Sequence, residues 1–512
     1  MNKPEHKPSG NSIMRMIFVG ISLLFQVGWI LMRVQWLNDY SQLISALTGL
    51  LAIAVVLYLN SKNTNAAMKM PWIMLILAMP MLGLSLYLLF EILGDPGIGK
   101  RLRKARQQKV MDPPESALRA FSHLEASDPG AACQSRYLWQ RAGYPVYENT
   151  TVRYFPEGKL ALEAMKQDLE KAERFIFMEY FIVEEESSFR ELEEILVRKA
   201  GQGVEVRLMY DDIGSVGKVN MRFAKGLNAK GIRCMPFNPA LPILNLFMNH
   251  RDHRKITVID GKVGFTGGYN LADEYFDRTH PYGKWKDTGI RLEGEAVRSL
   301  TETFLELWGV QEKSQEDTRK YLDIFHSVPA RGFVQPFADN PLEEERVAEN
   351  VYLNLIQQAR KTLWFITPYL IITDEMSHAL SLAAMRGVDV RIITPGIPDK
   401  KTVYAVTRSY YTGLARNGVR IYEYIPGFCH AKQCICDGEV VSIGTSNLDY
   451  RSLYHHFENN VLLMGSDAVQ EIALDFEATF AQCREVTEQY RMPRGKAMGT
   501  WQYILRLFAP LM

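Results

Sequence analysis

The chain has 512 residues, which is room for about three domains of ordinary size. With 47% hydrophobic and 23% charged residues and no low-complexity tract, its composition is globular and excludes a disordered or fibrous protein. The 59 Lys and Arg balance 58 Asp and Glu, so the whole chain lacks the basic character that nucleic-acid-binding proteins usually have.

The first hundred residues contain three apolar runs, at 17–32, 43–59 and 71–93. A helix needs about 20 apolar residues to cross about 30 Å of hydrocarbon, which the third run satisfies and the first two approach with their flanks. A cleaved signal peptide would account for the first run alone, but no small-x-small cleavage site follows it. Buried core helices are the other alternative, and three successive runs argue against it. We therefore predict a membrane anchor over residues 1–99 with two or three transmembrane segments.

A basic segment, KRLRKARQQK at residues 100–109, follows the third run. The positive-inside rule places this segment and everything after it in the cytoplasm, next to anionic membrane lipids. Three complete spans would leave the N-terminus outside, against which Lys3, Lys7 and Arg15 argue. Either the first run is re-entrant or interfacial, or this weak charge is overridden. We predict a multi-pass protein of the cell membrane.

The remaining residues alternate between apolar β-rich runs and amphipathic stretches, a pattern that predicts an α/β fold. The pattern occurs twice, since 171–183 corresponds to 358–372, 203–209 to 387–393 and 229–237 to 416–424. Matching order along about 150 residues indicates a duplicated unit. We therefore predict two pseudo-symmetric α/β units packed together, with a first repeat over 100–325 and a second over 326–512.

Each repeat contains one HxKxxxxD segment, HRKITVIDG at 253–261 and HAKQCICDG at 430–438. Asp-Gly between two apolar runs is a strong hairpin signal, so the residues before each Asp-Gly form a strand. Side chains alternate along a strand, so the His and the Lys project to one face and the Asp to the other, at the turn. The candidate site residues of the two segments are His253, Lys255, Asp260, His430, Lys432 and Asp437. We expect His and Lys to meet a ligand and Asp to fix the turn and the strand.

A second feature follows each Asp by seven residues, GGYN at 267–270 and GTSN at 444–447. Asn270 and Asn447 can donate amide hydrogens, and the glycines allow close backbone approach. Two Lys, two Asn and two His across a pseudo-twofold axis would surround one tetrahedral anion, and phosphate fits such a site.

Two imidazoles beside one phosphorus atom have complementary roles. One attacks phosphorus to form a covalent phosphohistidine, and the other protonates the departing alkoxide and then deprotonates the incoming alcohol. This chemistry requires no metal and no cofactor, and the sequence contains no HExxH or other dense ligand cluster. The alternative is a zinc site at Cys429, Cys434 and Cys436 around His430, but there is no CxxC pair, and cysteines in an apolar strand behave as small hydrophobes.

With these residues in view, the chain resembles the phospholipase D superfamily, whose hallmark is a doubled HxKxxxxDxxxxxxGSxN motif. Within that superfamily it is most similar to membrane-anchored bacterial cardiolipin synthases, in stretches such as NHRDHRKITVIDGKVGFTGGYNLADEYF, WKDTGIRLEG, GFCHAKQCICDG and GTSNLDYRS. The likeness covers nearly the whole chain after about residue 40. It implies transfer of a phosphatidyl group between two phosphatidylglycerol molecules, giving cardiolipin and glycerol.

The resemblance also implies individual roles. His253 would be the nucleophile and His430 the general acid and base. Glu458 would orient His253, and Asp287 would orient His430, with a surface salt bridge as the alternative for each carboxylate.

Three departures from the family pattern concern the surroundings of the site. The serine position of the motif is Gly268 in one copy and Thr445 in the other, so the first copy lacks a hydroxyl contact to phosphate. PYLIIT and LYHHFENN differ from the more usual PYFIP and LNFE, and we expect His455 and His456 to lie at the surface or in a substrate channel. The last stretch, 501–512, could lie in the bilayer interface or pack on the core.

Two other functions remain open. A hydrolase of the same superfamily would use water in place of the alcohol, and a related phosphatidyltransferase would use another alcohol acceptor. A catalytically dead membrane scaffold is disfavoured because both histidines and both lysines are present. The predicted partners are phosphatidylglycerol and anionic membrane lipids, without nucleic acid and without a protein partner.

Overall fold

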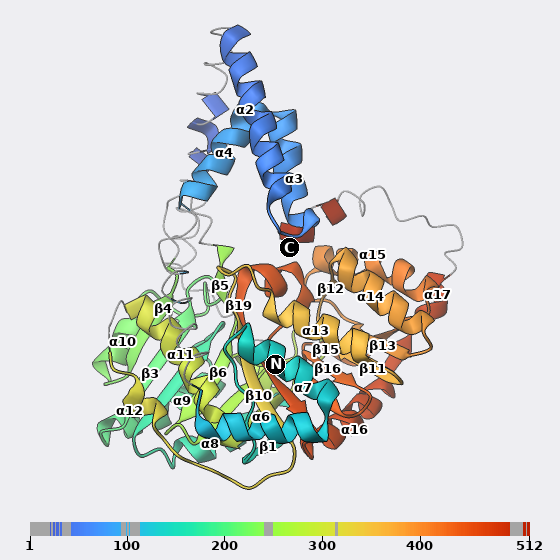
Figure 1. Cartoon of the computed structure of the whole chain (residues 1–512). Coiled ribbons are helices and arrows are strands. Elements are labelled where there is room, and N and C mark those ends of the chain that lie inside the picture. The colour runs from blue at the N-terminus through green and yellow to red at the C-terminus, as the bar shows by residue number, and fades with distance from the viewer. Residues whose placement is uncertain are drawn as a thin grey trace, which may run out of the picture.

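A computed structural model describes residues 42–93, 113–239, 249–312 and 316–491, with short pieces at 21, 24–25, 27–29, 31–32, 99, 102, 505–507 and 509–511. Two α/β units lie side by side, and a group of N-terminal helices projects from them (Figure 1). We call residues 150–312 the first unit and residues 333–491 the second unit.

The N-terminal helices are α2 (Gln42–Ser61), α3 (Ala66–Ala78) and α4 (Pro80–Leu93). The third apolar run, 71–93, is therefore divided between two helices, α3 and α4. Met79 leaves the helical region with ψ of 74° because the ring of Pro80 disfavours an α conformation in the preceding residue. The 13 residues of α3 cover only about 20 Å.

No helix among the described residues has both the length and the apolar character needed to traverse a bilayer. Half of the first predicted span, 17–32, lies outside the described residues, as does the basic segment 100–109 except for Leu102. The predicted transmembrane segments are thus not confirmed.

The helix group is held together by a small apolar cluster of its own, formed by Ala52, Leu59, Ile76, Leu84 and Tyr87. A methyl group at Gly83 would lie 2.6 Å from the Ile76 Cα, so only glycine allows α3 and α4 to approach so closely at their turn.

The lower end of the helix group rests on the second unit. Ala67 and Met68 pack against the core of that unit. In addition, Asn65 donates a hydrogen bond of 3.0 Å to Glu375 in α14 (Asp374–Met385).

The first unit is built on a seven-stranded sheet. In spatial order its strands are β1 (Thr150–Phe155), β9 (Gly289–Gly294), β7 (Val263–Gly267), β6 (Lys255–Ile259), β2 (Phe175–Tyr180), β3 (Glu205–Asp211) and β4 (Arg233–Phe237). Its helices are α8 (Gly158–Leu169), α9 (Ser187–Gly201), α10 (Phe223–Ala229) and α11 (Val297–Glu312). The strands β2, β3 and β4 are parallel, and every residue of β2 is buried, as expected for strands covered on both faces.

The second unit repeats this sheet order as β10 (Phe333–Asp339), β19 (His456–Met464), β17 (Val440–Gly444), β16 (Gln433–Cys436), β11 (Thr362–Ile366), β13 (Asp389–Pro395) and β14 (Arg420–Tyr424), followed by β20 (Cys483–Glu485). Its helices are α13 (Val347–Gln358), α14, α15 (Lys401–Arg416), α16 (Ala468–Phe480) and α17 (Thr487–Arg491). The predicted α/β duplication is confirmed strand by strand.

Two short helices that precede the first sheet in sequence pack on the second unit. Helices α6 (Glu115–Ser127) and α7 (Pro129–Gln140) belong by sequence to the segment expected as the first repeat. Their buried residues Ala120, Leu124 and Leu138 nevertheless pack with the core of the second unit.

The two sheets share one apolar core, which contains Phe177 and Ile256 of the first sheet together with Val441 and Val461 of the second. Helices α11 and α16 contribute to the same core, and each also contacts the edge strand of the other unit, β10 and β1 respectively. The units therefore form one continuous body.

Short strands are exchanged across this boundary in matching register. β5 (Arg251–Asp252) pairs in parallel with the start of β19, Arg251 opposite His456. β15 (Gly427–Cys429) pairs in parallel with β8 (Lys284–Lys286), Phe428 opposite Trp285. The residue after each exchanged strand is a motif histidine, so His253 and His430 each enter against the opposite unit.

Candidate active site

The two motif histidines occupy equivalent places. His253 lies between β5 and β6, and His430 lies between β15 and β16. Backbone hydrogen bonds fix both to the opposite unit, since the His253 N–H donates to Phe457 at 2.9 Å and the His430 N–H to Lys286 at 2.7 Å. Each histidine is 7% exposed, so both rings are largely withdrawn from water but reachable.

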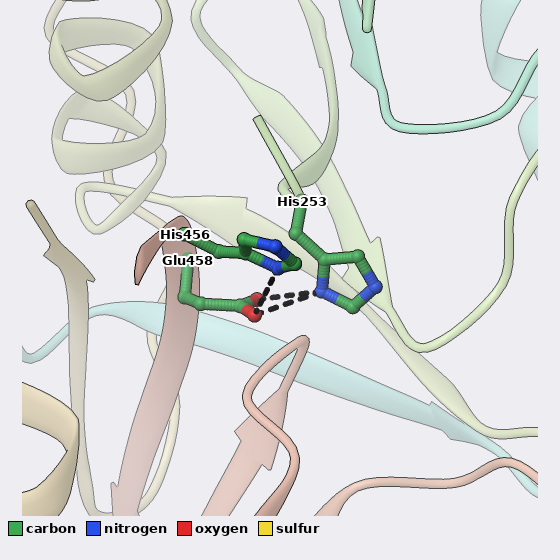
Figure 2. Close-up of side chains that lie close together, drawn as sticks. All are labelled: His253, His456 and Glu458. Atoms are coloured by element: carbon green, nitrogen blue, oxygen red, sulfur yellow. Dashed lines mark hydrogen bonds and ion pairs between the residues drawn. The ribbon is translucent and has the colours of Figure 1, made fainter. Parts of the chain in front are cut away.

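Each imidazole is hydrogen bonded to a carboxylate of the other unit. His253 Nδ1 lies 2.8 and 2.9 Å from the two carboxylate oxygens of Glu458 (Figure 2). His430 Nδ1 lies 2.7 Å from Asp287 Oδ2. This is the crossed arrangement that the sequence resemblance implied. A carboxylate accepts from Nδ1–H, which leaves the lone pair of the neutral ring on Nε2.

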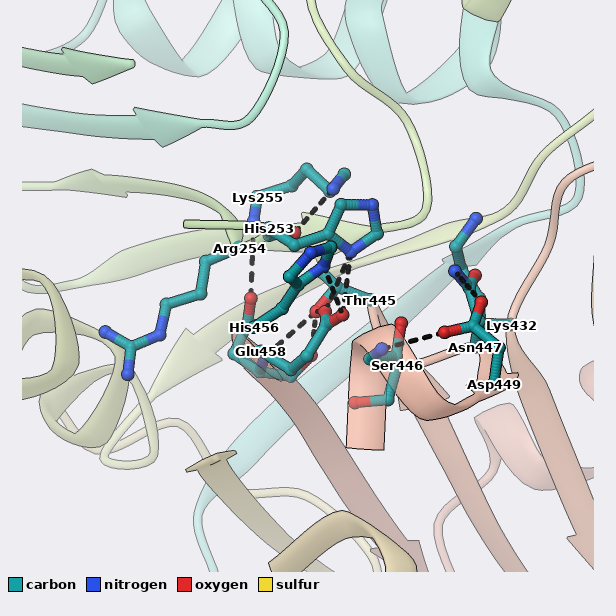
Figure 3. A network of polar contacts seen from close by, with 12 residues as sticks. His253, Arg254, Lys255, Lys432, Thr445, Ser446, Asn447, Asp449, His456 and Glu458 are labelled. Carbon is teal, nitrogen blue, oxygen red and sulfur yellow. Dashed lines mark hydrogen bonds and ion pairs between the residues drawn. The ribbon is translucent and has the colours of Figure 1, made fainter. Parts of the chain in front are cut away.

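The motif lysines lie on the same side as the histidines, as strand alternation predicts. Lys255 Nζ donates to the carbonyl of His253 at 2.5 Å (Figure 3). Lys432 Nζ lies 2.9 Å from His430 Nε2. Burial lowers the pKa of Lys255 to about 7 and that of Lys432 to about 8, while nearby carboxylates oppose the shift.

The same surroundings keep the histidines neutral. Burial, followed by the charge of Lys432, lowers the pKa of His430 to about 4, and burial with the charge of Lys255 lowers that of His253 well below its usual value. A neutral imidazole has the free lone pair that nucleophilic attack requires.

The lysine pKa values predict an alkaline limit to activity. A lysine carries its charge below its pKa, so the ammonium groups of Lys255 and Lys432 are lost as pH rises through about 7 and about 8. We expect kcat/KM, which reports the free enzyme, to fall over that range. The variant Lys255→Arg keeps its charge and is expected to retain only the fall due to Lys432. A pH profile of kcat/KM that stays flat up to about pH 10, the ordinary lysine value, would contradict this prediction.

Asp260 and Asp437 belong to the candidate site residues of the two segments, but they do not join the imidazoles. They fix the turn, as strand alternation predicts. The carboxylate of Asp260 accepts hydrogen bonds from the backbone N–H groups of residues 173–175, and that of Asp437 from those of residues 360–362. Both have positive φ, 54° and 52°. Each aspartate lies at the opposite end of its strand from the motif lysine, about 17 Å from it along the strand. Its hydrogen bonds hold the turn against the start of β2 in the first unit and of β11 in the second.

The two motif asparagines are oriented differently. Asn270 accepts from the Ile182 N–H at 3.0 Å through Oδ1, which turns its amide nitrogen toward other partners. Asn447 donates to Asp449 at 3.0 Å, and its Oδ1 is buried without a hydrogen-bond partner among the described residues. Asp449, which sequence analysis did not single out, therefore sets which group Asn447 presents.

Gly268 and Thr445, at equivalent positions of the two motifs, lie next to the carboxylates that orient the histidines. Thr445 donates to Glu458 at 2.5 Å, so its hydroxyl supports the partner of His253. At the equivalent position a methyl group on Gly268 would lie 2.1 Å from Asp287 Oδ1, which explains the absence of a side chain there.

Aromatic and imidazole rings complete the walls of the site. Phe181 and His456 lie 5.0 and 5.5 Å from the His253 ring between centroids, and Tyr275 and Trp285 lie 5.3 and 5.4 Å from the His430 ring. In the sequence, His456 stands two residues before Glu458 and Trp285 stands two residues before Asp287, so the two side chains hold equivalent positions relative to the orienting carboxylates.

His455 and His456 were expected at the surface or in a substrate channel. Both rings are buried, so the surface position is wrong, and the ring of His456 lies in the wall of the site beside His253. His455 Nε2 lies 3.2 Å from the carbonyl of Pro510, which brings part of the C-terminal stretch against the second unit. Leu505 and Ala509 pack in the core of that unit, so the described part of 501–512 packs on the core.

One group of described residues near the imidazoles has the donor types of a metal site, namely His253, His456 and Glu458. The cysteine alternative does not form such a group within the described part of the chain. Cys429, Cys434 and Cys436 are buried in β15 and β16 as apolar side chains.

Two family models match the chain. The model described as "Cardiolipin synthase, PLD-like domain" matches residues 165–308 and 352–480, that is, most of both units. A model described as phospholipase D-nuclease N-terminal matches residues 49–91.

Known proteins match over almost the whole length. An uncharacterized protein of Streptococcus mutans serotype c is 42% identical over 90% of this chain and 100% of its own length. A cardiolipin synthase of Geobacillus sp. (strain WCH70) is 34% identical over 93% of this chain and 96% of its own. The crystal structure of phosphatidylserine synthase from Haemophilus influenzae Rd KW20 has the same fold, with a TM-score of 0.52 over 70% of this chain and 93% of that one at 14% identity.

Proposed function

Since the chain belongs to the cardiolipin synthase family of phospholipase D-like proteins, we propose that it transfers a phosphatidyl group from one phosphatidylglycerol to another and releases glycerol. The observation that carries the proposal is the pair of buried imidazoles, each bonded through Nδ1 to a carboxylate of the opposite unit. Their Nε2 atoms are the reactive atoms of the site.

In the first half of the proposed reaction, His253 Nε2 attacks the phosphorus of the donor lipid. The bond between phosphorus and the glycerol oxygen breaks, and the departing oxygen takes a proton from His430. His430 must therefore be protonated when substrate is bound. The negative phosphodiester supports this, because a nearby anion raises the pKa of an imidazole.

In the second half, the phosphatidyl group on His253 passes to the acceptor. The now neutral His430 removes the proton from a glycerol hydroxyl of a second phosphatidylglycerol, whose oxygen attacks phosphorus. The bond from phosphorus to Nε2 then breaks, which restores free His253 and protonated His430.

The phosphate oxygens would be held by Lys255, Lys432 and Asn270. The lysines supply charge, and the amide nitrogen of Asn270, whose Oδ1 is held by the Ile182 N–H, supplies an oriented donor. The burial of these groups strengthens their interaction with charge that develops in the transition state.

We also propose attachment to the cell membrane, with the catalytic units on the cytoplasmic side. Exposed apolar side chains on α2 and α3 support attachment, among them Leu50 at 66% and Leu57 at 64% exposure. The basic segment at 100–109 supports the cytoplasmic side. Both lipid substrates lie in a membrane, so attachment brings the site to them.

The test is to incubate the purified protein with phosphatidylglycerol liposomes in the presence of EDTA and to analyse the products by mass spectrometry. We expect cardiolipin and glycerol in equal amounts. Phosphatidic acid without cardiolipin would replace the proposal by a hydrolase. A product formed only when phosphatidylethanolamine is added would replace it by a transferase with another acceptor.

A further inference from the structure

The side chain of His456 has no part in the proposed reaction, although its ring stands beside that of His253. It is 8% exposed, and neither ring nitrogen has a hydrogen-bond partner among the described residues. Its Nδ1 lies 4.0 Å from Glu458 Oε1, too far for a hydrogen bond (Figure 2). A buried imidazole with two unused nitrogens requires an explanation.

The ligand atoms of His253, His456 and Glu458 all lie within 4.8 Å of one another, and all three side chains are buried. Two histidines and a glutamate are a known donor set for zinc, with zinc to ligand distances of about 2.0–2.2 Å. Such distances place tetrahedral ligands about 3.3 Å apart. The 2.8 Å and 4.0 Å separations from Glu458 lie on either side of that value, so small rotations would reach it.

We propose that His253, His456 and Glu458 form a binding site for a divalent transition-metal ion such as zinc, and that the bound ion switches the enzyme off. Binding takes Nδ1 of His253 as a ligand, so the single proton of the neutral ring moves from Nδ1 to Nε2. Nε2 then lacks the lone pair with which it attacks phosphorus. The ion also separates His253 from Glu458, which removes the support for the nucleophile.

The opposite half of the active site lacks the third ligand. Trp285 occupies the place of His456 there, beside His430 and Asp287. The indole N–H is a donor only and does not bind metal. The proposal therefore predicts one ion for each chain.

The inhibitory part of this inference rests on the proposed role of His253, but metal binding can be measured without any substrate. The full-length protein is stripped of metal with EDTA and exchanged into chelator-free buffer. It is then titrated with zinc chloride, and bound zinc is measured after gel filtration. We expect one zinc ion for each chain. X-ray absorption is expected to show nitrogen and oxygen ligands without sulfur.

The decisive variant is His456→Asn, with His455→Asn as the matched control. Loss of even an outer partner of a metal ligand costs about 10–100-fold in affinity, so His456→Asn is expected to lose at least about 100-fold. His455→Asn, which removes the neighbouring buried ring, is expected to bind zinc like the parent protein. Equal affinity of parent and His456→Asn, or sulfur ligands in the parent, would overturn the site.

The effect on activity is measured as the ratio of cardiolipin formation with and without zinc for the same variant, so changes in basal rate cancel. The ratio is expected to fall in the parent protein and in His455→Asn, and to stay near one in His456→Asn. Equal loss in all three would mean that zinc acts elsewhere, and the inference would fail. Absence of cardiolipin in zinc-free parent protein would instead refute the proposed function and leave the binding result standing.

Discussion

Replacing His253 with alanine is expected to lower cardiolipin formation on the order of 10⁴-fold or more, because it removes the nucleophile that forms the covalent bond to phosphorus in the proposed reaction. The phosphatidyl adduct should disappear with it. Intact-protein mass spectrometry after alkaline quenching, which preserves phosphohistidine, measures the adduct in the parent protein and the variant.

His430→Ala is the comparison that separates the two histidines. It lacks the acid and base but keeps the nucleophile, so we expect a loss of about 10²–10⁴-fold. A phosphatidyl substrate with a nitrophenol leaving group needs no protonation. It should restore adduct formation in His430→Ala and not in His253→Ala. The opposite pattern would exchange the roles of the two residues.

The second large effect is expected from Glu458→Gln, which keeps the shape of the side chain but removes its charge. Glu458 holds the Nδ1 proton of His253, and the amide can instead donate to Nδ1 and impose the wrong tautomer. Comparable changes in carboxylate-imidazole pairs cost about 10⁴-fold in kcat, and we expect a loss of about 10³–10⁴-fold here.

The control for this variant is Glu423→Gln. Glu423 is another buried glutamate, which lies in β14 of the second unit and is paired with Arg408 and Arg484. It should retain normal kcat where it folds. Circular dichroism and thermal melting establish folding of both variants. Normal kcat in a folded Glu458→Gln protein would refute the orienting role.

Local sequence patterns predicted the parts of the fold that depend on local rules. Asp-Gly marked the hairpins that join β6 to β7 and β16 to β17, and alternation placed Lys255 and His253 on one face. The duplication predicted two equivalent sheets. The break at Met79 also has a local signal in Pro80, because a proline disfavours the α conformation in the residue before it.

Contacts between distant residues could not be predicted in the same way. His456 lies beside His253 only because β5 pairs with β19, and no local pattern links residues so far apart. Likewise, α6 and α7 precede the first sheet in sequence but pack on the second unit. The pairing of Glu458 with His253 was implied by the family resemblance alone, because the spacing of residues along the chain does not determine which side chains meet.

Asp260 and Asp437 show that a motif can combine reactive and structural residues. The Asp-Gly signal and strand alternation predicted that both aspartates fix the turn, and this is confirmed. Their carboxylates bind three successive backbone N–H groups at the beginning of the neighbouring strand. A strictly repeated residue near a reactive centre can thus be repeated because the turn needs it.

The exchange of β5 and β15 between the units makes catalysis a property of their association. Each half carries a histidine whose carboxylate is supplied by its neighbour, so an isolated half would hold a nucleophile or a base without its support. Denaturant that loosens the junction before melting either sheet should abolish turnover while helical and strand signals persist. Enzymatic rate would then report docking of the halves more sensitively than any spectroscopic probe of secondary structure.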